Sequence, residues 1–295
     1  MKIDIFADLM RLVKRNRDGS YATQAARKYV LAQVAHDLKD MGFRTLPATG
    51  LKPKHVEALV ARWKASGIAA STMKNRMSHV RWWAEKVGKQ NCVPRSNGEL
   101  QIAKRRYVTN ISKALTIDDE YLQKISDERL RCSIELQFAF GLRREECLKF
   151  QAKYALSGRP LDEVSEIKLK SSWCKGGRSR IVPITDEHQR AVLARAIAFC
   201  GNGSMIPKHL RYIDQVRRYV RTVKKAGLSK LHGLRHQYAQ RRYQQLTGWL
   251  APAAGGPIAP QLSPEQRNID RVARLQVSSE LGHNREEITA VYLGR

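Results

Sequence analysis

The sequence predicts a mainly α-helical protein with one small antiparallel β-sheet, arranged in two domains. Apolar residues recur at helical spacing along most of the chain, as in 55–67. Alternation typical of strands is confined to one short stretch, 165–184, which surrounds a pair of glycines. A basic stretch with turn residues, 93–113, separates a helical first third from a mixed remainder. A chain of 295 residues also has the length of about two domains. We therefore expect domains at 1–92 and 114–295, joined by the linker 93–113.

The first domain is expected to be wholly helical. Helices are predicted over 21–42, 55–67 and 71–88, and each range closes on a glycine placed to end the helix. In 71–88 the apolar residues form one stripe, and Lys74 and Arg81 lie off it. That stripe is typical of a core-facing surface, and the basic face is typical of a solvated surface or a phosphate contact.

The second domain mixes helices with a hairpin. Helices are predicted over 115–125 and over 132–150, the latter interrupted by a turn at Gly141. Strand residues, Ile167 and Leu169 before the glycines and Ile181 and Ile184 after them, surround a turn that contains Lys175. Further helices follow at 212–227, 231–246 and 268–280, and the proline- and glycine-rich stretch 247–266 is predicted to be a loop.

The charge points to a polyanionic partner. Lys and Arg number 54 against 27 Asp and Glu, a net charge of +27. Residues 201–250 hold eleven basic residues and one acid, 51–100 hold ten and three, and 251–295 hold five of each. Two basic regions suit a protein that holds a nucleic-acid duplex from two sides, with an anionic membrane surface as the second candidate. The chain shows no long apolar run and no signal peptide, and its five scattered cysteines indicate a reducing cytoplasm.

Several polar residues stand at turns inside otherwise apolar helical sequence. Each has an ordinary explanation alone: a solvated charge, a packed histidine or an anchoring tyrosine. Together they suit cleavage of a phosphodiester without a metal. Two guanidiniums neutralise charge on the phosphate oxygens, a tyrosine hydroxyl attacks, and a lysine supplies a proton. The residues are Arg143, Glu146, Lys175, His232, Arg235, His283 and Tyr292.

These residues lie in the motifs GLRREE, CKGGRSRIVPI, HGLRHQYA and LGHNREEITAVY. In this order the motifs resemble the tyrosine recombinase (phage-type integrase) family, which includes the Xer, Cre and lambda integrases. The resemblance runs from about Leu115 to Tyr292. It implies a helical, SAM-like core-binding domain and an α+β catalytic domain that form a C-shaped clamp on DNA.

The resemblance implies a role for each matching position. Arg143 and Arg235 would hold the scissile phosphate, with Arg143 preferred over its neighbour Arg144 because Glu146 follows it by three residues. Glu146 would support the first arginine, and His283 would bond a non-bridging oxygen.

The remaining roles concern the nucleophile and protons. Tyr292 would form a 3′-phosphotyrosine, Lys175 would protonate the leaving 5′ oxygen, and His232 would serve proton transfer. No metal, ATP or other cofactor is expected. The expected function is site-specific recombination that integrates or excises a mobile element. A type IB-like topoisomerase and a non-catalytic DNA-binding relative remain open.

The expected partners follow from the same resemblance. They are double-stranded DNA with specific sites, a homotetramer on synapsed DNA, and a directionality or DNA-bending factor; no membrane is expected. The expected location is the bacterial cytoplasm, at the nucleoid. Lower-ranked candidates for DNA contact are Lys74, Arg76, Arg81, Arg217, Arg218 and Arg221.

Two features depart from the common family pattern. The separation of His232 from His283 is long, and the excess is the run around 249–264. The sequence also ends three residues after Tyr292. We therefore expect Tyr292 to be mobile in the free protein, because little chain beyond it would restrain it.

Overall fold

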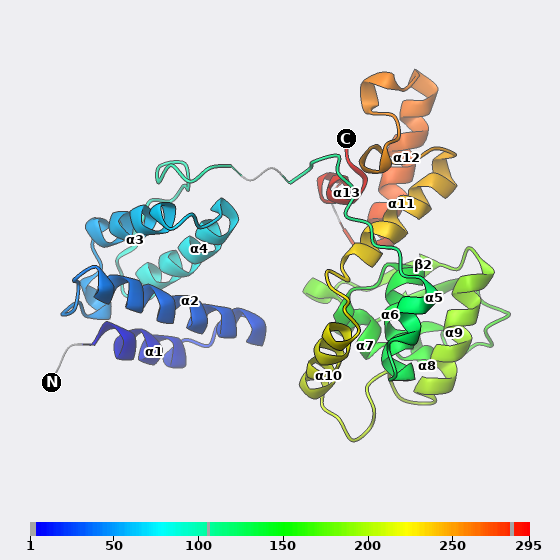
Figure 1. The fold of residues 1–295 in the computed structure, drawn as a ribbon, viewed down its shortest axis with the longest axis horizontal. Helices are drawn as coiled ribbons and strands as arrows, with labels where there is room; N and C mark the ends of the chain where they lie inside the picture. The colour runs from blue at the N-terminus through cyan, green and yellow to red at the C-terminus, as the bar shows by residue number, and fades with distance from the viewer. Residues whose placement is uncertain (1–3, 105–106, 284–285) are drawn as a thin grey trace. The chain divides into compact units, whose positions relative to one another are not determined.

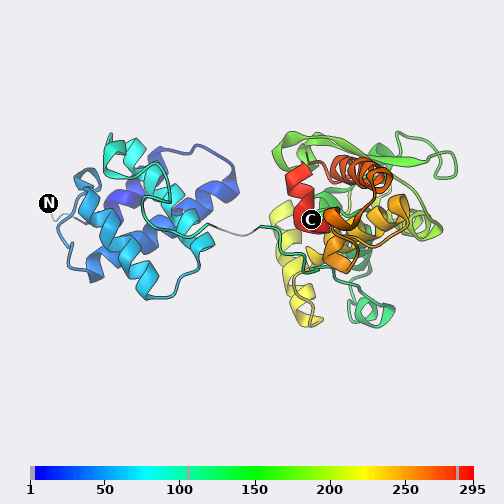
Figure 2. The same ribbon diagram turned by 90° about the horizontal axis from the view of Figure 1, so that it is seen from above.

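A computed structural model describes residues 4–104, 107–283 and 286–295. The chain divides into two compact units, Met1–Arg106 and Tyr107–Arg295 (Figure 1 and Figure 2). The division lies within the stretch 93–113. Residues 105 and 106 of this stretch, two arginines of the basic linker, lie outside the described residues.

In the described part of the first unit, the regular elements are all helices. Helices α1 (Ile5–Arg15), α2 (Tyr21–Asp40), α3 (Pro53–Ala65) and α4 (Ala70–Lys86) enclose an apolar core, with short turns η1 (Ala48–Gly50) and η2 (Gln90–Cys92). Two fully buried tryptophans anchor this core, and each indole N–H has a partner. Trp63 donates to Asp37 Oδ2 at 2.8 Å, and Trp83 donates to the Ala48 carbonyl at 2.8 Å. Their apolar area is therefore buried without leaving a polar group unpaired.

The second unit is helical around one hairpin. It begins with α5 (Asp119–Gln123), α6 (Glu128–Phe140), α7 (Arg144–Lys149) and α8 (Ala152–Ala155). After the hairpin come α9 (Glu187–Cys200), α10 (Tyr212–Lys225), α11 (Gly233–Thr247), α12 (Pro264–Glu280) and α13 (Glu286–Leu293). Helix α6 packs against α7, α9 and α11, so it lies at the centre of the unit. The prediction of a mainly helical fold is confirmed.

The hairpin is a two-stranded antiparallel sheet, which confirms the predicted strand, turn and strand. Strand β1 (Glu166–Leu169) pairs with β2 (Arg180–Pro183), and Leu169 lies opposite Arg180. Between them lie the turns η3 (Ser171–Trp173) and η4 (Lys175–Gly177). The buried positions of β2 are Arg180 and Val182, whereas Ile181 is 47% exposed. Arg180 therefore faces the interior, whereas Ile181, which was expected to be the inward residue, faces outward.

Several helices differ from the prediction: α5 and α6 begin four residues from their predicted starts, and α8 was not predicted. Helix α9 was not predicted, although its buried residues Val192, Leu193, Ala196 and Cys200 lie at helical spacing after the buried Gln189. Helix α12 begins at Pro264, four residues before the predicted start. There Ser263 accepts a hydrogen bond from the Gln266 N–H at 3.2 Å, which caps the helix one residue before the proline. The predicted loop before it contains the turns η5 (Pro252–Ala254) and η6 (Ala259–Gln261).

Candidate active site

The turn after α6 places Arg143. Gly141 ends α6 in the left-handed conformation, with φ of 60°, and a Cβ at this position would lie 2.6 Å from Cδ1 of Tyr238. Both facts require glycine. Arg143 then caps α7: its backbone N–H donates to Glu146 Oε2 at 2.7 Å, and its Nη1 donates to Oε1 at 2.8 Å. Arg144, the neighbouring alternative, is exposed on the surface of α7.

Glu146 is fully buried between two arginines. Arg180 on β2 donates from Nη1 to Oε1 at 2.8 Å and from Nη2 to Oε2 at 2.6 Å, which makes a bidentate pair. Arg180 also donates from Nε to the Glu280 carbonyl at 2.8 Å, at the end of α12. Burial raises the pKa of Glu146, but Arg180, Arg235 and Arg143 outweigh it and lower the pKa to about 2. Glu146 is therefore an anion that ties α7, β2 and α12 together.

Arg235 is a buried cation on the first turn of α11. Its Nη1 donates to the Gly141 carbonyl at 2.5 Å, its Nη2 donates to the Leu281 carbonyl, and Nη2 lies 3.4 Å from His283 Nε2. Its Nε has no hydrogen-bond partner among the described residues. Burial and then the charge of Arg143 lower the pKa of Arg235 to about 10, so the group remains charged at neutral pH.

Tyr292 on α13 lies among three histidines. Its hydroxyl is 3.2 Å from His232 Nε2. Its ring centroid lies 4.4 Å from that of His236 and 5.4 Å from that of His283, and the Arg235 guanidinium carbon is 5.8 Å from it. Segments of sequence far apart therefore bring Tyr292, His232, Arg235 and His283 into one cluster.

The histidines of this cluster are neutral near pH 7. Burial first, and then the charges of Arg235 and Arg143, lower the pKa of His283 to about 3. The same causes in the same order lower the pKa of His232, although part of the residue is exposed. The pKa of His236 falls to about 4, because of burial first and then the charges of His232 and Lys113. A neutral imidazole at His232 can accept a proton from the tyrosine.

The packing around Tyr292 contradicts the expectation that little would restrain it. Its side chain is 6% exposed, and the following Leu293 is fully buried. The Tyr292 carbonyl accepts a hydrogen bond from Gln240 Nε2 at 3.0 Å. The restraint comes from the packing of α13 against other segments of the second unit. The expected unrestrained Tyr292 is therefore wrong for this structure.

Lys175 lies in the connection between β1 and β2, on an exposed turn. Gly176 and Gly177 follow it with φ of 75° and 68°, a left-handed pair that glycine adopts without strain. Lys175, Arg143 and His232 line one open pocket of about 650 Å³. The structure thus brings the lysine to the pocket that two other candidate residues share.

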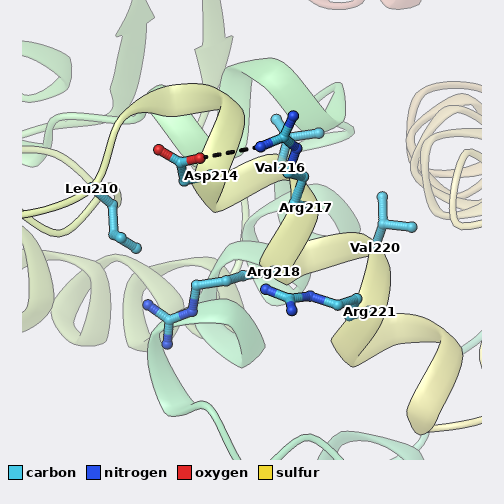
Figure 3. Close-up of a pocket in the computed structure, with 7 residues that line it drawn as sticks. All are labelled: Leu210, Asp214, Val216, Arg217, Arg218, Val220 and Arg221. Atoms are coloured by element: carbon cyan, nitrogen blue, oxygen red, sulfur yellow. Dashed lines mark ion pairs between the residues drawn. The ribbon is translucent and has the colours of Figure 1, made fainter.

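The candidate DNA contacts of the second unit lie on α10. Arg217, Arg218 and Arg221 line one shallow hollow, and Figure 3 shows their side chains spread along the helix. Arg217 pairs with Asp214 at 3.5 Å, and Arg218 pairs with Asp127 at 2.7 Å. Arg217 and Arg221 are exposed, and Arg218 is half-buried.

The candidates of the first unit lie on α4 and differ in their surroundings. The Arg76 guanidinium stacks on Trp63 at 5.2 Å and lies 3.8 Å from Asp37. Arg81 donates to the Pro94 carbonyl at 2.9 Å and to Asn97 Oδ1 at 3.0 Å. Both arginines therefore take part in the packing of their own unit, and Lys74 is half-buried beside them.

Two kinds of site are absent from the described ranges. No group of three or more His, Cys, Asp or Glu residues there is arranged to hold a metal ion. None of the helices in the same ranges has both the length and the apolar character that crossing a bilayer needs.

Comparison with known families identifies both parts of the chain. The family profile described as "Phage integrase, N-terminal" matches residues 4–93, and the profile described as "Integrase" matches residues 103–241. The chain belongs to the tyrosine recombinase family. The resemblance drawn from the four motifs is thereby confirmed. A search of curated protein sequences found no match.

Solved structures of tyrosine recombinases share the fold. The integrase of the Tn1549 transposon, in complex with circular intermediate DNA, has a TM-score of 0.55 and 15% identity over 99% of this chain and 96% of that one. A lambda integrase dimer bound to a COC′ core site has a TM-score of 0.61 and 16% identity over 100% and 97%. At these identities the likeness concerns the fold, and it confirms the expected SAM-like first part and α+β second part.

Two residues of the candidate site were not predicted from the sequence. Arg180 bonds Glu146, and it lies two residues before Val182, so strict alternation along the strand would have placed it inward. His236 lies one residue after Arg235 in the HGLRHQYA motif, and its ring is the nearest of the three histidine rings to Tyr292. The position of His236 directly after the candidate residue Arg235 was the signal from which it could have been predicted.

Proposed function

We propose that this recombinase cleaves and rejoins DNA at specific sites through a 3′-phosphotyrosine on Tyr292, and that it integrates or excises a mobile element. The observation that carries the proposal is the 3.2 Å contact between the Tyr292 hydroxyl and His232 Nε2, beside the buried cation Arg235. A nucleophile, a neutral proton acceptor and an arginine within one cluster are the groups that attack on a phosphodiester needs.

The chemistry balances without a metal. The Tyr292 oxygen forms a bond to phosphorus, and the bond from phosphorus to the 5′ oxygen breaks. His232 accepts the tyrosine proton, and Lys175 gives a proton to the departing 5′ oxygen. Rejoining runs these steps in reverse, with a 5′ hydroxyl attacking the phosphotyrosine. Because the ester keeps the energy of the broken bond, the cycle needs no ATP.

The arginines would bind the phosphate that reacts. A guanidinium presents several N–H donors in a plane that matches phosphate oxygens. Arg235 keeps its Nε without a partner among the described residues, and Arg143 keeps part of its guanidinium exposed over the pocket. His283, 3.4 Å from Arg235, would bond a non-bridging oxygen. Glu146 and Arg180 hold these groups in place and would not contact the DNA.

The proposed partner is duplex DNA. A net charge of +27 favours association with a polyanion, and the arginines of α10 lie in the same unit as Tyr292. The proposed complex is a homotetramer on two synapsed sites, with a directionality or DNA-bending factor as a further partner. The solved Tn1549 integrase and lambda integrase complexes, which contain DNA, support a DNA partner by fold.

The experiment that tests the proposal traps DNA on the protein. The parent protein is expressed in bacterial cells, and DNA that stays attached after denaturation is sequenced. We expect reads that end at one position within a specific site, and none from Tyr292→Phe. Attached DNA from random positions would instead indicate a topoisomerase. The absence of attached DNA from the parent would indicate a non-catalytic relative.

A further inference from the structure

The segment that enters the second unit runs directly against the candidate active site. Residues 110–115 pass along α13 and the start of α11 (Figure 1). The Leu115 N–H donates to the Gly233 carbonyl at 3.1 Å, next to His232. A Cβ on Gly233 would lie 2.7 Å from the Lys113 carbonyl oxygen, so the segment and the helix are in close contact.

The side chain of Asn110 both donates a hydrogen bond to the backbone of Arg295, three residues after Tyr292, and accepts one from it. Its Nδ2 donates to the Arg295 carbonyl at 2.7 Å, and its Oδ1 accepts from the Arg295 N–H at 2.8 Å. A Cβ on Gly294 would lie 2.7 Å from the same Oδ1. The asparagine has φ of 48°, a left-handed conformation that asparagine tolerates better than most residues.

A second connection reaches the tyrosine itself. Ser112 Oγ donates to Gln240 Oε1 at 3.0 Å, and Gln240 Nε2 donates to the Tyr292 carbonyl at 3.0 Å. Gln240 is buried, so its amide orientation is set by these two bonds. The serine thus fixes the glutamine, and the glutamine fixes the last turn of α13.

We propose that residues 110–115 form a brace that positions Tyr292, with Asn110, Ser112 and Gln240 as its positioning residues. The brace matters because α13 is short, at eight residues. A helix of this length has little stability of its own. Its direction, and with it the aim of the Tyr292 hydroxyl, depends on what holds its end. This inference rests on the proposed function, because it assigns the brace to a nucleophile.

The test uses the whole chain and three variants. Asn110→Gly removes both side-chain bonds and leaves a residue that accepts the left-handed backbone. Asn110→Asp keeps the acceptor for the Arg295 N–H and removes the donor. Ser157→Gly is the matched control, because Ser157 is also left-handed, with φ of 56°, and is exposed after α8. Two quantities are measured: amide hydrogen exchange in peptides from 286–294, and the single-turnover rate of covalent attachment at saturating DNA.

If the brace positions Tyr292, the variants should rank in a fixed order in both measurements. Exchange in 286–294 rises and the attachment rate falls by about fivefold to tenfold in Asn110→Gly, which is the effect of removing one or two hydrogen bonds. Asn110→Asp lies between this variant and the parent, Ser157→Gly matches the parent, and DNA affinity is unchanged in all. Exchange in 286–294 that stays at the parent level in Asn110→Gly would overturn the brace. If the parent attaches no DNA, the proposed function fails, and the exchange measurement alone still decides the brace.

Discussion

Arg180 and Glu146 form a bidentate ion pair inside the second unit, with Nη–Oε distances of 2.8 and 2.6 Å and both side chains buried. Glu146 also bonds Arg143, so one carboxylate holds the turn that carries a candidate phosphate ligand. Arg180 in turn bonds the Glu280 carbonyl, shortly before His283. The pair therefore fixes two parts of the candidate site: the turn that carries Arg143 and the end of α12 before His283.

Replacing only one partner of the Arg180–Glu146 pair should reduce the free energy of unfolding more than replacing both partners together. Arg180→Met leaves a buried carboxylate with Arg143 as its remaining partner, and we expect it to reduce the free energy of unfolding by about 3 to 5 kcal/mol. Glu146→Gln leaves a buried guanidinium and should also destabilise. The double variant should be more stable than the sum of the two losses implies. Denaturant unfolding of all four proteins measures the cycle, and strictly additive losses would contradict the coupling.

Gly141 should tolerate alanine far less well than a glycine of similar conformation. Gly141→Ala meets both a left-handed backbone and the Tyr238 ring, whereas Gly158, with φ of 73°, has nothing within 4 Å of an added Cβ. We expect Gly158→Ala to cost about 1 to 2 kcal/mol from backbone strain, and Gly141→Ala to cost more. Thermal unfolding compares the two variants. Equal losses in the two variants would contradict the close contact between residue 141 and the Tyr238 ring.

The cleavage rate should show no histidine titration near neutral pH. The pKa values of His232 and His283 are both lowered, that of His283 to about 3. Because the neutral imidazoles persist as pH falls, protonation should reduce the rate only at pH values below the ordinary histidine pKa of about 6.5. A single-turnover pH profile of DNA attachment measures this. A loss centred near 6.5 would contradict the cation-flanked histidines described above.

The exposed arginines of α10 should contribute to DNA affinity through phosphate. Replacing Arg217 and Arg221 together by glutamine should reduce the slope of log affinity against log salt by about 2, one for each phosphate that is no longer neutralised. Lys153→Gln combined with Arg159→Gln, at two exposed basic residues of α8 and the turn after it, removes the same number of charges and is the control for a change in net charge alone. Salt titrations of DNA binding give the slopes. A double variant with the slope of the control would remove α10 from the interface.

Local patterns predicted much of the fold, and long-range contacts account for what they missed. The helices over 21–40, 55–65 and 71–86 follow from apolar spacing and a terminal glycine, and the hairpin follows from alternation around Gly176 and Gly177. Helix α9 was missed although Val192 and Leu193 lie on its buried face. The buried Gln189 on the same face donates to the Ala139 carbonyl, 50 residues away, which local spacing does not show. Arg180 was missed because its partner, Glu146, lies 34 residues away.

The nucleophile's surroundings were the hardest part to predict. The motifs placed Tyr292 and His232 in one candidate site, and the structure brings their side chains to 3.2 Å although they are 60 residues apart. The short stretch after Tyr292 suggested freedom, because sequence alone does not show that Asn110, 185 residues earlier, bonds Arg295. A hydrogen bond to a segment far away in the sequence leaves no periodic pattern of apolar residues from which it could be predicted.

In the proposed function, Tyr292 becomes covalently joined to DNA. The most direct measurement is mass spectrometry of the trapped adduct, after nuclease digestion of the DNA and proteolysis of the protein. We expect a nucleotide remnant attached through its 3′ phosphate to the peptide that contains Tyr292. A remnant on a peptide that lacks Tyr292, or an adduct that persists in Tyr292→Phe, would contradict it.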